Sequence, residues 1–252
     1  MSKEKEPVMK PCRVLFTIFA CAAFSAAFQQ AFAAKHEPRP EQFATTELLA
    51  GPPAFGSWRQ KADLEAYAEG LALRETERGK QAAEDADLSP LEAFEARFSR
   101  VAGITISKDA TPETDRLLSL AMSYVYPSVS SKKFYKRARP FVFNKADKTC
   151  RPDLLEKTKP MQSYPSGHTS MAWGLALTLA AVLPGDPTPV LRTGWEAGES
   201  RWICGAHWQS DVEAGRELSA AAFARALSNE DFREAMEKSR EELKAAAGAT
   251  TP

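Results

Sequence analysis

The segment Ser163-Tyr164-Pro165-Ser166-Gly167-His168-Thr169-Ser170 stands directly before an apolar run, residues 171–183. Pro-Ser-Gly is typical of a helix entrance, and the run ends before Pro184-Gly185, so a helix is predicted after Gly167. Because this helix is apolar nearly all round, we expect it to be the central buried helix of the domain. At about thirteen residues, the apolar run is too short to cross a bilayer.

Helical spacing dominates the chain on both sides of this segment. Four predicted inner faces are Leu64, Tyr67, Ala68 and Leu71; Leu91, Phe94 and Phe98; Leu117, Leu120, Ala121, Tyr124 and Val125; and Phe232, Ala235, Met236 and Leu243. Helix starts are predicted at Ser89-Pro90, Thr111-Pro112 and Thr188-Pro189, and another helix from near His207 to about Leu227. Strand signals are confined to residues 103–106 and 141–143. The sequence therefore predicts an all-α, single-domain helical bundle.

Composition and charge are ordinary for a globular protein. The 252 residues are 44% hydrophobic and 26% charged, with 33 basic and 33 acidic residues. This balance gives no global field for a nucleic acid or an acidic partner. The predicted organisation is a signal peptide at 1–33, an extended arm rich in Pro and Gly at 34–57, and a helical domain at 58–252.

The first 33 residues have the pattern of a secretory signal. Lys3, Lys5, Lys10 and Arg13 precede an apolar stretch at 14–28, and Ala31-Phe32-Ala33 supplies small residues before the expected cleavage. Two alternatives stay open: a retained membrane anchor, if Gln29 and Gln30 are tolerated, and lipidation at Cys21. We expect an exported protein, periplasmic or secreted, whose mature chain has no membrane span.

Cysteine usage fits export. Cys12 and Cys21 would leave with the signal peptide, and Cys150 and Cys204 remain as an even pair in an oxidising compartment. A disulfide between them is favoured, with two buried thiols as the alternative.

Three polar segments carry the candidate chemistry. The first contains Lys132 and ends at Arg139-Pro140, where proline pushes the arginine out of helical geometry. Lys132 lies seven positions before Arg139, so on a helix both would lie on the same side. A solvated basic face is the alternative for this run of cations.

The second segment is the helix entrance at Ser166-Gly167-His168. Unpaired N–H groups and the helix dipole favour an anion there, and Ser166 adds a hydroxyl. A plain helix cap is the alternative interpretation.

The third segment runs from Arg201 to Asp211. His207 and Asp211 are four residues apart, so on a helix the carboxylate would hold one ring nitrogen and leave the other free as a nucleophile. Arg201 lies one loop upstream. Of the three histidines in the chain, two fall in these segments, which makes chance placement a poor explanation.

Together these segments resemble the three-part signature of the phosphatidic-acid-phosphatase type 2 superfamily. The signature residues are Lys132, Arg139-Pro140, Pro165-Ser166-Gly167-His168, Ser200-Arg201, His207 and Asp211. The flanking words Tyr-Lys-Arg-Ala-Arg-Pro-Phe and Gly-Glu-Ser-Arg resemble, more narrowly, the class A bacterial non-specific acid phosphatases, which are helical periplasmic enzymes. Gln162 stands directly before Ser163-Tyr164-Pro165-Ser166-Gly167-His168, where the family more often has a glycine. Gln162 and Trp202 would reshape the rim of the pocket, which puts the substrate preference in doubt.

The resemblance implies a role for each residue. His207 would attack phosphorus and form a phosphohistidine, Asp211 would orient its ring, and His168 would protonate the leaving oxygen and later activate water. Lys132, Arg139, Arg201, Ser166 and the Gly167 N–H would surround the phosphate oxygens, so that no metal and no cofactor is expected. A protonated His168 would suit an acidic optimum. Asp85, Glu199 and Glu213 lack the spacing of a metal site.

The predicted activity is hydrolysis of small phosphate monoesters, with transfer of phosphate to alcohols as an extension. A vanadate-dependent haloperoxidase with the same oxyanion cage is the main alternative. A membrane lipid phosphatase would need several spans, and a non-catalytic phosphate-binding protein would tolerate loss of His207. The sequence leaves a homo-oligomer open.

Overall fold

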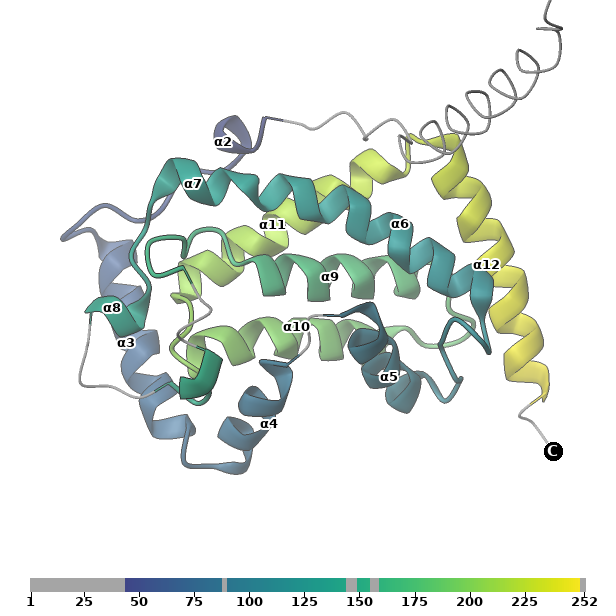
Figure 1. The fold of residues 1–252 in the computed structure, drawn as a ribbon, viewed down its shortest axis with the longest axis horizontal. Helices are drawn as coiled ribbons and strands as arrows, with labels where there is room; N and C mark the ends of the chain where they lie inside the picture. The colour runs from purple at the N-terminus through teal and green to yellow at the C-terminus, as the bar shows by residue number, and fades with distance from the viewer. Residues whose placement is uncertain (1–43, 88–89, 144–148, 155–158, 250–252) are drawn as a thin grey trace, which may run out of the picture. The chain divides into compact units, whose positions relative to one another are not determined.

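The computed structural model describes residues 44–87, 90–143, 149–154 and 159–249, and their regular elements are all helical (Figure 1). The helices are α2 (Thr45–Leu48), α3 (Trp58–Leu73), α4 (Glu77–Asp85), α5 (Leu91–Ala102), α6 (Pro112–Ser128), η1 (Val129–Ser131), α7 (Lys132–Tyr135), α8 (Pro140–Phe143), η2 (Pro152–Leu154), α9 (Gly167–Ala180), α10 (Thr188–Ile203), α11 (Gln209–Ala226) and α12 (Glu230–Ala249). This confirms the predicted all-α class. The predicted signal peptide lies outside the described residues.

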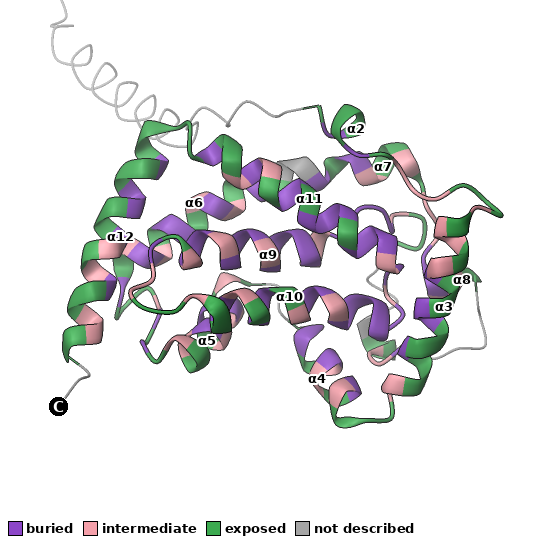
Figure 2. Cartoon of the chain, turned by 180° about the vertical axis from the view of Figure 1, so that it is seen from behind, coloured by how far each residue is buried: buried purple, intermediate pink, exposed green. Residues whose placement is uncertain are grey.

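Helix α9 is central, as its apolar sequence predicts. It packs against α6, α10 and α11, and Figure 2 shows buried residues around most of its circumference. Leu175, Ala176 and Leu179 are fully buried in the main hydrophobic cluster. None of the described helices is both long enough and apolar enough to cross a membrane.

Two glycines let the neighbouring helices approach α9 closely. A Cβ atom at Gly194 of α10 would collide with Ala176, and one at Gly174 of α9 would lie 2.7 Å from a methyl group of Val125 on α6. Contacts this short leave no room for a side chain. The central layer therefore depends on small residues at the helix crossings.

Several predicted inner faces agree with the structure, but that of α3 is confirmed only at Tyr67. Phe232, Ala235, Met236 and Leu243 of α12 are buried as predicted. On α3, Leu64 and Leu71 are exposed, and the buried residues include Asp63 and Gly70. The face of α3 turned to the domain is set by a hydrogen-bonded carboxylate and a close backbone contact, which an apolar pattern does not record.

The segments predicted as extended are not strands. Residues 141–143 form most of the single turn α8, and residues 103–106 begin with the left-handed Gly103 that ends α5. The described part of the predicted arm contains the one-turn helix α2, and α3 begins at Trp58 with Ser57 as its N-cap. The predicted N-cap Ser89 of α5 lies outside the described residues.

A distant carboxylate caps the start of α6. Glu242 on α12 accepts hydrogen bonds from the backbone N–H groups of Glu113 (3.0 Å) and Thr114 (2.9 Å), and from the Thr114 hydroxyl (2.7 Å). The first N–H groups of a helix have no partner within it. Glu242 therefore fastens α12 onto α6 through the start of α6.

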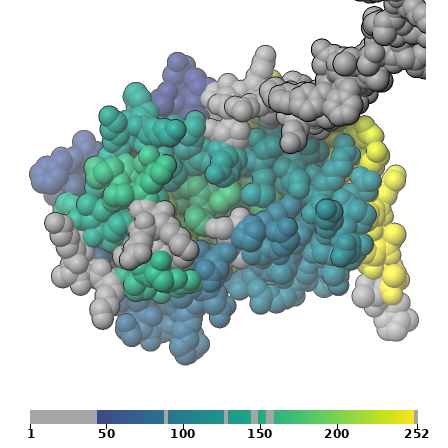
Figure 3. Space-filling view, in the orientation of Figure 1, coloured from purple at the N-terminus to yellow at the C-terminus, as the bar shows by residue number. Residues whose placement is uncertain are grey.

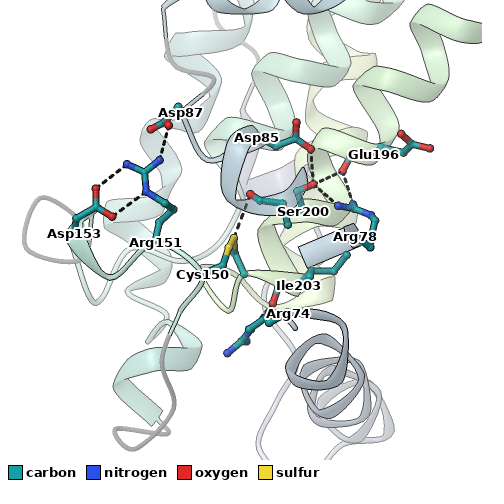
Figure 4. Close-up of a disulfide and its surroundings, with 12 residues drawn as sticks. Arg74, Arg78, Asp85, Asp87, Cys150, Arg151, Asp153, Glu196, Ser200 and Ile203 are labelled. Atoms are coloured by element: carbon teal, nitrogen blue, oxygen red, sulfur yellow. Dashed lines mark hydrogen bonds and ion pairs between the residues drawn. A yellow bond between two sulfur atoms is a disulfide. The ribbon is translucent and has the colours of Figure 1, made fainter. Parts of the chain in front are cut away.

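Cys150 and Cys204 form a disulfide, with Cα atoms 4.9 Å apart. Figure 4 shows it near the end of α10, beside Arg151, which pairs with Asp87 and Asp153. Cys204 follows Arg201 by three residues and precedes His207 by three. The bond therefore ties the segment before η2 to the end of α10, between the candidate site residues Arg201 and His207.

We expect Glu242→Ala to lower the free energy of unfolding by about 1–2 kcal/mol, because two N–H groups at the start of α6 lose their partner. Urea unfolding followed by circular dichroism measures this difference. The matched control is Glu241→Ala, which removes an exposed neighbouring carboxylate. Equal stabilities of the two variants would contradict the capping role.

We expect a reducing agent to lower the melting temperature, corresponding to a loss of about 2–4 kcal/mol, because the reduced chain regains conformational freedom when unfolded. Differential scanning calorimetry with and without dithiothreitol measures the shift. A Cys150→Ser, Cys204→Ser double variant should melt at one temperature in both conditions. A wild-type protein indifferent to the reductant would contradict a stabilising disulfide.

Candidate active site

Ser166 starts α9 and joins it to α11. Its hydroxyl accepts hydrogen bonds from the N–H (3.4 Å) and the hydroxyl (2.8 Å) of Thr169, and its own N–H donates to the Asp211 carbonyl (2.9 Å). The peptide bond between Tyr164 and Pro165 is cis. The cap interpretation of Ser166 is thus correct, and its hydroxyl hydrogen remains able to donate to an anion at the helix start.

Lys132 reaches this helix start from another part of the chain. A Cβ atom at Gly167 would lie 3.5 Å from Cε of Lys132. The ammonium group donates to the carbonyls of Gln162 and Ser163, both at 3.3 Å. Figure 3 shows the segment before α9, in green, at the surface beside the teal residues of α7. Lys132 and Gly167 therefore lie together, as the sequence predicts.

The expected geometry between Lys132 and Arg139 is wrong, although both residues lie in the site. Helix α7 ends at Tyr135, and Lys136 adopts a left-handed conformation with φ of 47°. The two cations therefore do not share a helix face. Instead, the end of α7 and the turn at Lys136 bring the two side chains into the same site.

Arg139 binds the candidate nucleophile. One terminal nitrogen, Nη1, lies 2.8 Å from Nε2 of His207 and 2.7 Å from the carbonyl of Ala206. Its other nitrogens donate to the carbonyls of Lys159 and Gln162, each at 3.0 Å. A guanidinium only donates, so Nε2 of His207 must be the accepting, unprotonated nitrogen. That assignment places the ring hydrogen on Nδ1.

His207 and Asp211 do not share a helix face as predicted, because α11 begins only at Gln209. His207 lies in the preceding turn, where its N–H donates to the Arg201 carbonyl. Its Nδ1 lies 3.4 Å from Oδ2 of Asp211, without the geometry of a hydrogen bond. The carboxylate still faces the protonated ring nitrogen, and such contacts often tighten when substrate binds.

Arg201 is a buried cation without a protein partner for two of its nitrogens. It lies in the last turn of α10, one loop upstream of α11 as expected, and is 6% exposed. Its Nε and Nη1 make no hydrogen bond within the described residues. A buried, unpaired guanidinium is costly unless an anion completes its bonds. Arg201 thus indicates an oxyanion site.

The three cations perturb one another. Burial, together with the neighbouring arginines, lowers the pKa of Lys132 to about 7. Burial also lowers the pKa of Arg139 to about 10, with Arg201 adding to the effect, and the pKa of Arg201 to about 10, against the attraction of Asp85. Like charges held together out of water favour an anion between them.

Burial and nearby charges disfavour protonation of both histidines. Burial lowers the pKa of His168 well below its ordinary value, and so do Arg201, Lys132 and Arg139. The same causes act on His207, whose ring lies near His168 as well. Because three cations act on His168, a bound anion that offsets their charge would raise its pKa. The expected protonation of His168 stays a prediction for the complex with an anion.

Asp211 is a fully buried carboxylate with several donors. Oδ2 accepts from the Ser163 hydroxyl (2.5 Å) and the Trp208 N–H (2.8 Å), and Oδ1 accepts from Arg137 (2.7 Å). Burial raises the pKa of Asp211, while Arg137, Ser163, Trp208 and Lys132 oppose that rise. These donors hold the carboxyl group in one orientation beside His207.

The structure brings all the predicted site residues to one place, and it adds Arg137, Ser163 and Asp63, which the sequence did not single out. Arg137 stood in the basic run without a feature to separate it from its neighbours. Asp63 lies on α3 and had no signal beyond being an acidic residue in a helix. Among the described residues, no group of three or more His, Cys, Asp or Glu side chains is arranged to hold a metal ion.

Comparison with known proteins agrees with this geometry. Residues 113–233 match the PAP2 superfamily, and the chain belongs to it. Non-specific acid phosphatases are similar along most of their length. The Salmonella typhi protein is 44% identical over 222 residues, which cover 87% of this chain and 86% of the relative. The Providencia stuartii protein is 40% identical over 198 residues, which cover 78% and 79% of the two chains.

We expect sulfate to raise the melting temperature of the wild-type protein. At a hundredfold excess of sulfate over its dissociation constant, the free energy of unfolding should rise by about 2.7 kcal/mol. Lys132→Met should weaken this effect, because one of the three cations is lost. Calorimetry over a sulfate series measures it. Lys133→Met, which removes an exposed neighbouring charge, is the control and should respond like wild type.

The same variant has a second expected result without sulfate. Because the folded pKa of Lys132, about 7, lies below its ordinary 10.5, the cost of its charge is full below pH 7 and disappears towards pH 10.5. Lys132→Met should therefore be more stable than wild type at acid pH, with the gain fading as the pH rises. Equal sulfate responses of the Lys132 and Lys133 variants would contradict an anion site to which Lys132 contributes.

Proposed function

We propose that this protein is an acid phosphatase that hydrolyses phosphate monoesters of broad specificity through a phosphohistidine at Nε2 of His207. One observation carries this proposal above the others. The unprotonated Nε2 of a buried histidine lies beside a guanidinium, while a second buried guanidinium, Arg201, has unpaired nitrogens. A nucleophilic nitrogen beside guanidinium groups whose nitrogens are partly unpaired is suited to bind and attack a phosphate group.

In the first step, Nε2 attacks phosphorus and the bond to the ester oxygen breaks. Arg139 turns from Nε2 to a phosphate oxygen, while Lys132 and Arg201 bind the others and offset their charge. His168 gives its proton to the leaving oxygen, which departs as the alcohol. Asp211 faces Nδ1–H and stabilises the positive ring of the phosphohistidine.

In the second step, His168 accepts a proton from water as the water oxygen attacks phosphorus. The bond between phosphorus and Nε2 breaks, and inorganic phosphate leaves with the histidine restored. An alcohol in place of water would receive the phosphate by the same route. This accounts for phosphate transfer as a side reaction of the proposed site.

Acidic conditions favour the first step for a reason visible in the site. Burial and the cations lower the pKa of His168, and the anionic substrate brings negative charge that would raise it. Binding of substrate and protonation of His168 therefore support each other. Lys132 also keeps its charge only on the acid side of its pKa of about 7.

We further propose that residues 1–33 act as a signal peptide and that the enzyme works outside the cytoplasm. The support is the basic start, the apolar stretch and Ala31-Phe32-Ala33. The disulfide between Cys150 and Cys204 fits an oxidising compartment. Small phosphate monoesters are the proposed substrates, without a metal ion or other cofactor.

We expect His207→Ala to lower kcat for p-nitrophenyl phosphate by a factor of about 10³ or more, because the covalent route is lost. His36→Ala is the control and should retain activity, because His36 is the histidine that lies outside the candidate segments. Quenching wild-type turnover in alkali should preserve a phosphohistidine that mass spectrometry assigns to His207.

Further arms of this assay separate the rival mechanisms. EDTA should leave the wild-type rate unchanged, whereas full inhibition reversed by a divalent metal would contradict a metal-free reaction. Halide oxidation by peroxide with added vanadate tests the haloperoxidase alternative. An active His207→Ala would remove the proposed nucleophile altogether.

A further inference from the structure

Arg137 lies behind the candidate active site and joins two buried carboxylates. Its Nη1 donates to Oδ1 of Asp211 at 2.7 Å and to the Ser210 hydroxyl at 2.8 Å, and its Nη2 donates to Oδ2 of Asp63 at 2.6 Å. The three side chains are 12%, 0% and 2% exposed for Arg137, Asp211 and Asp63. This arrangement is a closed ion network and not a surface pair.

The network holds Oδ1 of Asp211, whereas the other carboxylate oxygen, Oδ2, faces His207. Arg137 binds Oδ1, whereas Oδ2 lies 3.4 Å from Nδ1 of the histidine. Fixing Oδ1 from behind limits rotation of the carboxylate, so Oδ2 stays directed at the ring. Arg137 thus acts on His207 through Asp211.

Asp63 fixes Arg137 in turn, and it comes from a separate helix. Its Oδ1 accepts the Ser210 N–H at 2.9 Å, and its Oδ2 accepts the Ser210 hydroxyl at 2.7 Å. The Ser210 N–H belongs to the first turn of α11, so Asp63 of α3 also caps that helix. A Cβ atom at Gly70 would lie 3.2 Å from Cα of Ile203, which shows how closely α3 is seated.

The charges explain why a fourth cation is useful. Lys132, Arg139 and Arg201 lie on the phosphate side, where bound phosphate offsets them. Arg137 lies on the other side of Asp211, with its guanidinium 5.5 Å from the centre of the Trp208 ring. With Arg137 positive and both carboxylates negative, the network carries one net negative charge. That charge matches the positive ring of a phosphohistidine.

We propose that Arg137, held by Asp63, is a positioning residue that aims the Asp211 carboxylate at His207 for phosphoryl transfer. This inference rests on the proposed role of His207 as the nucleophile. Arg137 binds neither of the predicted phosphate-binding arginines nor the start of α9. Its loss should therefore affect the chemical step more than the binding of an oxyanion.

Arg137→Gln is the first test. We expect kcat for p-nitrophenyl phosphate to fall by about tenfold to a hundredfold, the range typical of residues that orient a functional side chain. The inhibition constant of inorganic phosphate should change less than threefold, because Lys132, Arg139 and Arg201 remain. Asp63→Asn should show the same separation of kcat from phosphate binding.

The pH profile supplies a readout that a purely structural role would not move. The groups that face or act on Asp211 are Arg137, Arg139, Lys132, His207, Tyr164, the Ser163 hydroxyl and the Trp208 N–H, with Asp63 behind Arg137. Removing the Arg137 charge raises the pKa of the Asp211 carboxyl. Activity of Arg137→Gln should therefore be lost at higher pH than in wild type as the solution is acidified. Arg137→Lys restores the charge and should return the acid limb towards wild type.

Arg216→Gln is the matched control, because Arg216 has a side chain of 10% exposure and pairs with Glu199. We expect it to lower stability but to leave kcat within twofold and the acid limb unchanged. Circular dichroism and thermal melting establish that each variant is folded under assay conditions.

The outcomes are distinguishable. If His207→Ala is inactive but folded Arg137→Gln keeps wild-type kcat and acid limb, the positioning role is wrong and the proposed function stands. The role is also wrong if the phosphate inhibition constant rises as much as kcat falls. If His207→Ala remains active, both the nucleophile and the inference built on it are lost.

Discussion

The site depends on holding three cations together, the buried Arg139 and Arg201 and the partly buried Lys132, without neutralising them in advance. Hydrogen bonds from Lys132 and Arg139 go mainly to backbone carbonyls, those of Lys159, Gln162, Ser163 and Ala206. A carbonyl fixes the direction of a cation but carries no full charge, so the attraction remains for a phosphate. The carboxylates Asp63 and Asp211 lie behind His207 and are offset by Arg137. This separation of the cations from the carboxylates gives the site its polarity.

The fold achieves this by ending and starting helices at one place. Arg201 closes α10, Ser166 begins α9, and Asp211 lies in the first turn of α11. Two glycines make the approach close: a Cβ at Gly198 would lie 2.9 Å from Thr169, and one at Gly215 would lie 2.7 Å from the Ser166 carbonyl. Segments far apart in sequence thus meet through backbone contacts, which are stiffer than contacts between long side chains. Rigid support of this kind is what a reaction based on positioning requires.

The sequence predicts the helices and the site residues where the signal is local. Proline and glycine mark the ends of helices, apolar runs mark α9, and unusual polar words mark the three segments. It fails where a side-chain direction depends on a break in the chain: Lys132 and Arg139 are separated by the left-handed Lys136, and His207 precedes α11 instead of sharing its face with Asp211. It also misses Asp63, whose partners Ser210 and Arg137 are 147 and 74 residues away. No local pattern in a single sequence records such a pairing.

The charge arrangement also explains why this chemistry belongs to acidic solution. The site resists protonation of His168 and His207, because burial and three cations oppose another positive charge. In the proposed mechanism a phosphate ester reverses that balance, so that the proton for the leaving oxygen becomes stable once the substrate is in place. The protonated acid is then formed where it is used and does not weaken the fold beforehand. At alkaline pH the same site loses the charge of Lys132, whose pKa is about 7. The site then attracts phosphate less strongly, and less bound phosphate is present to raise the pKa of His168. Acidic operation therefore follows from the burial of the cage itself.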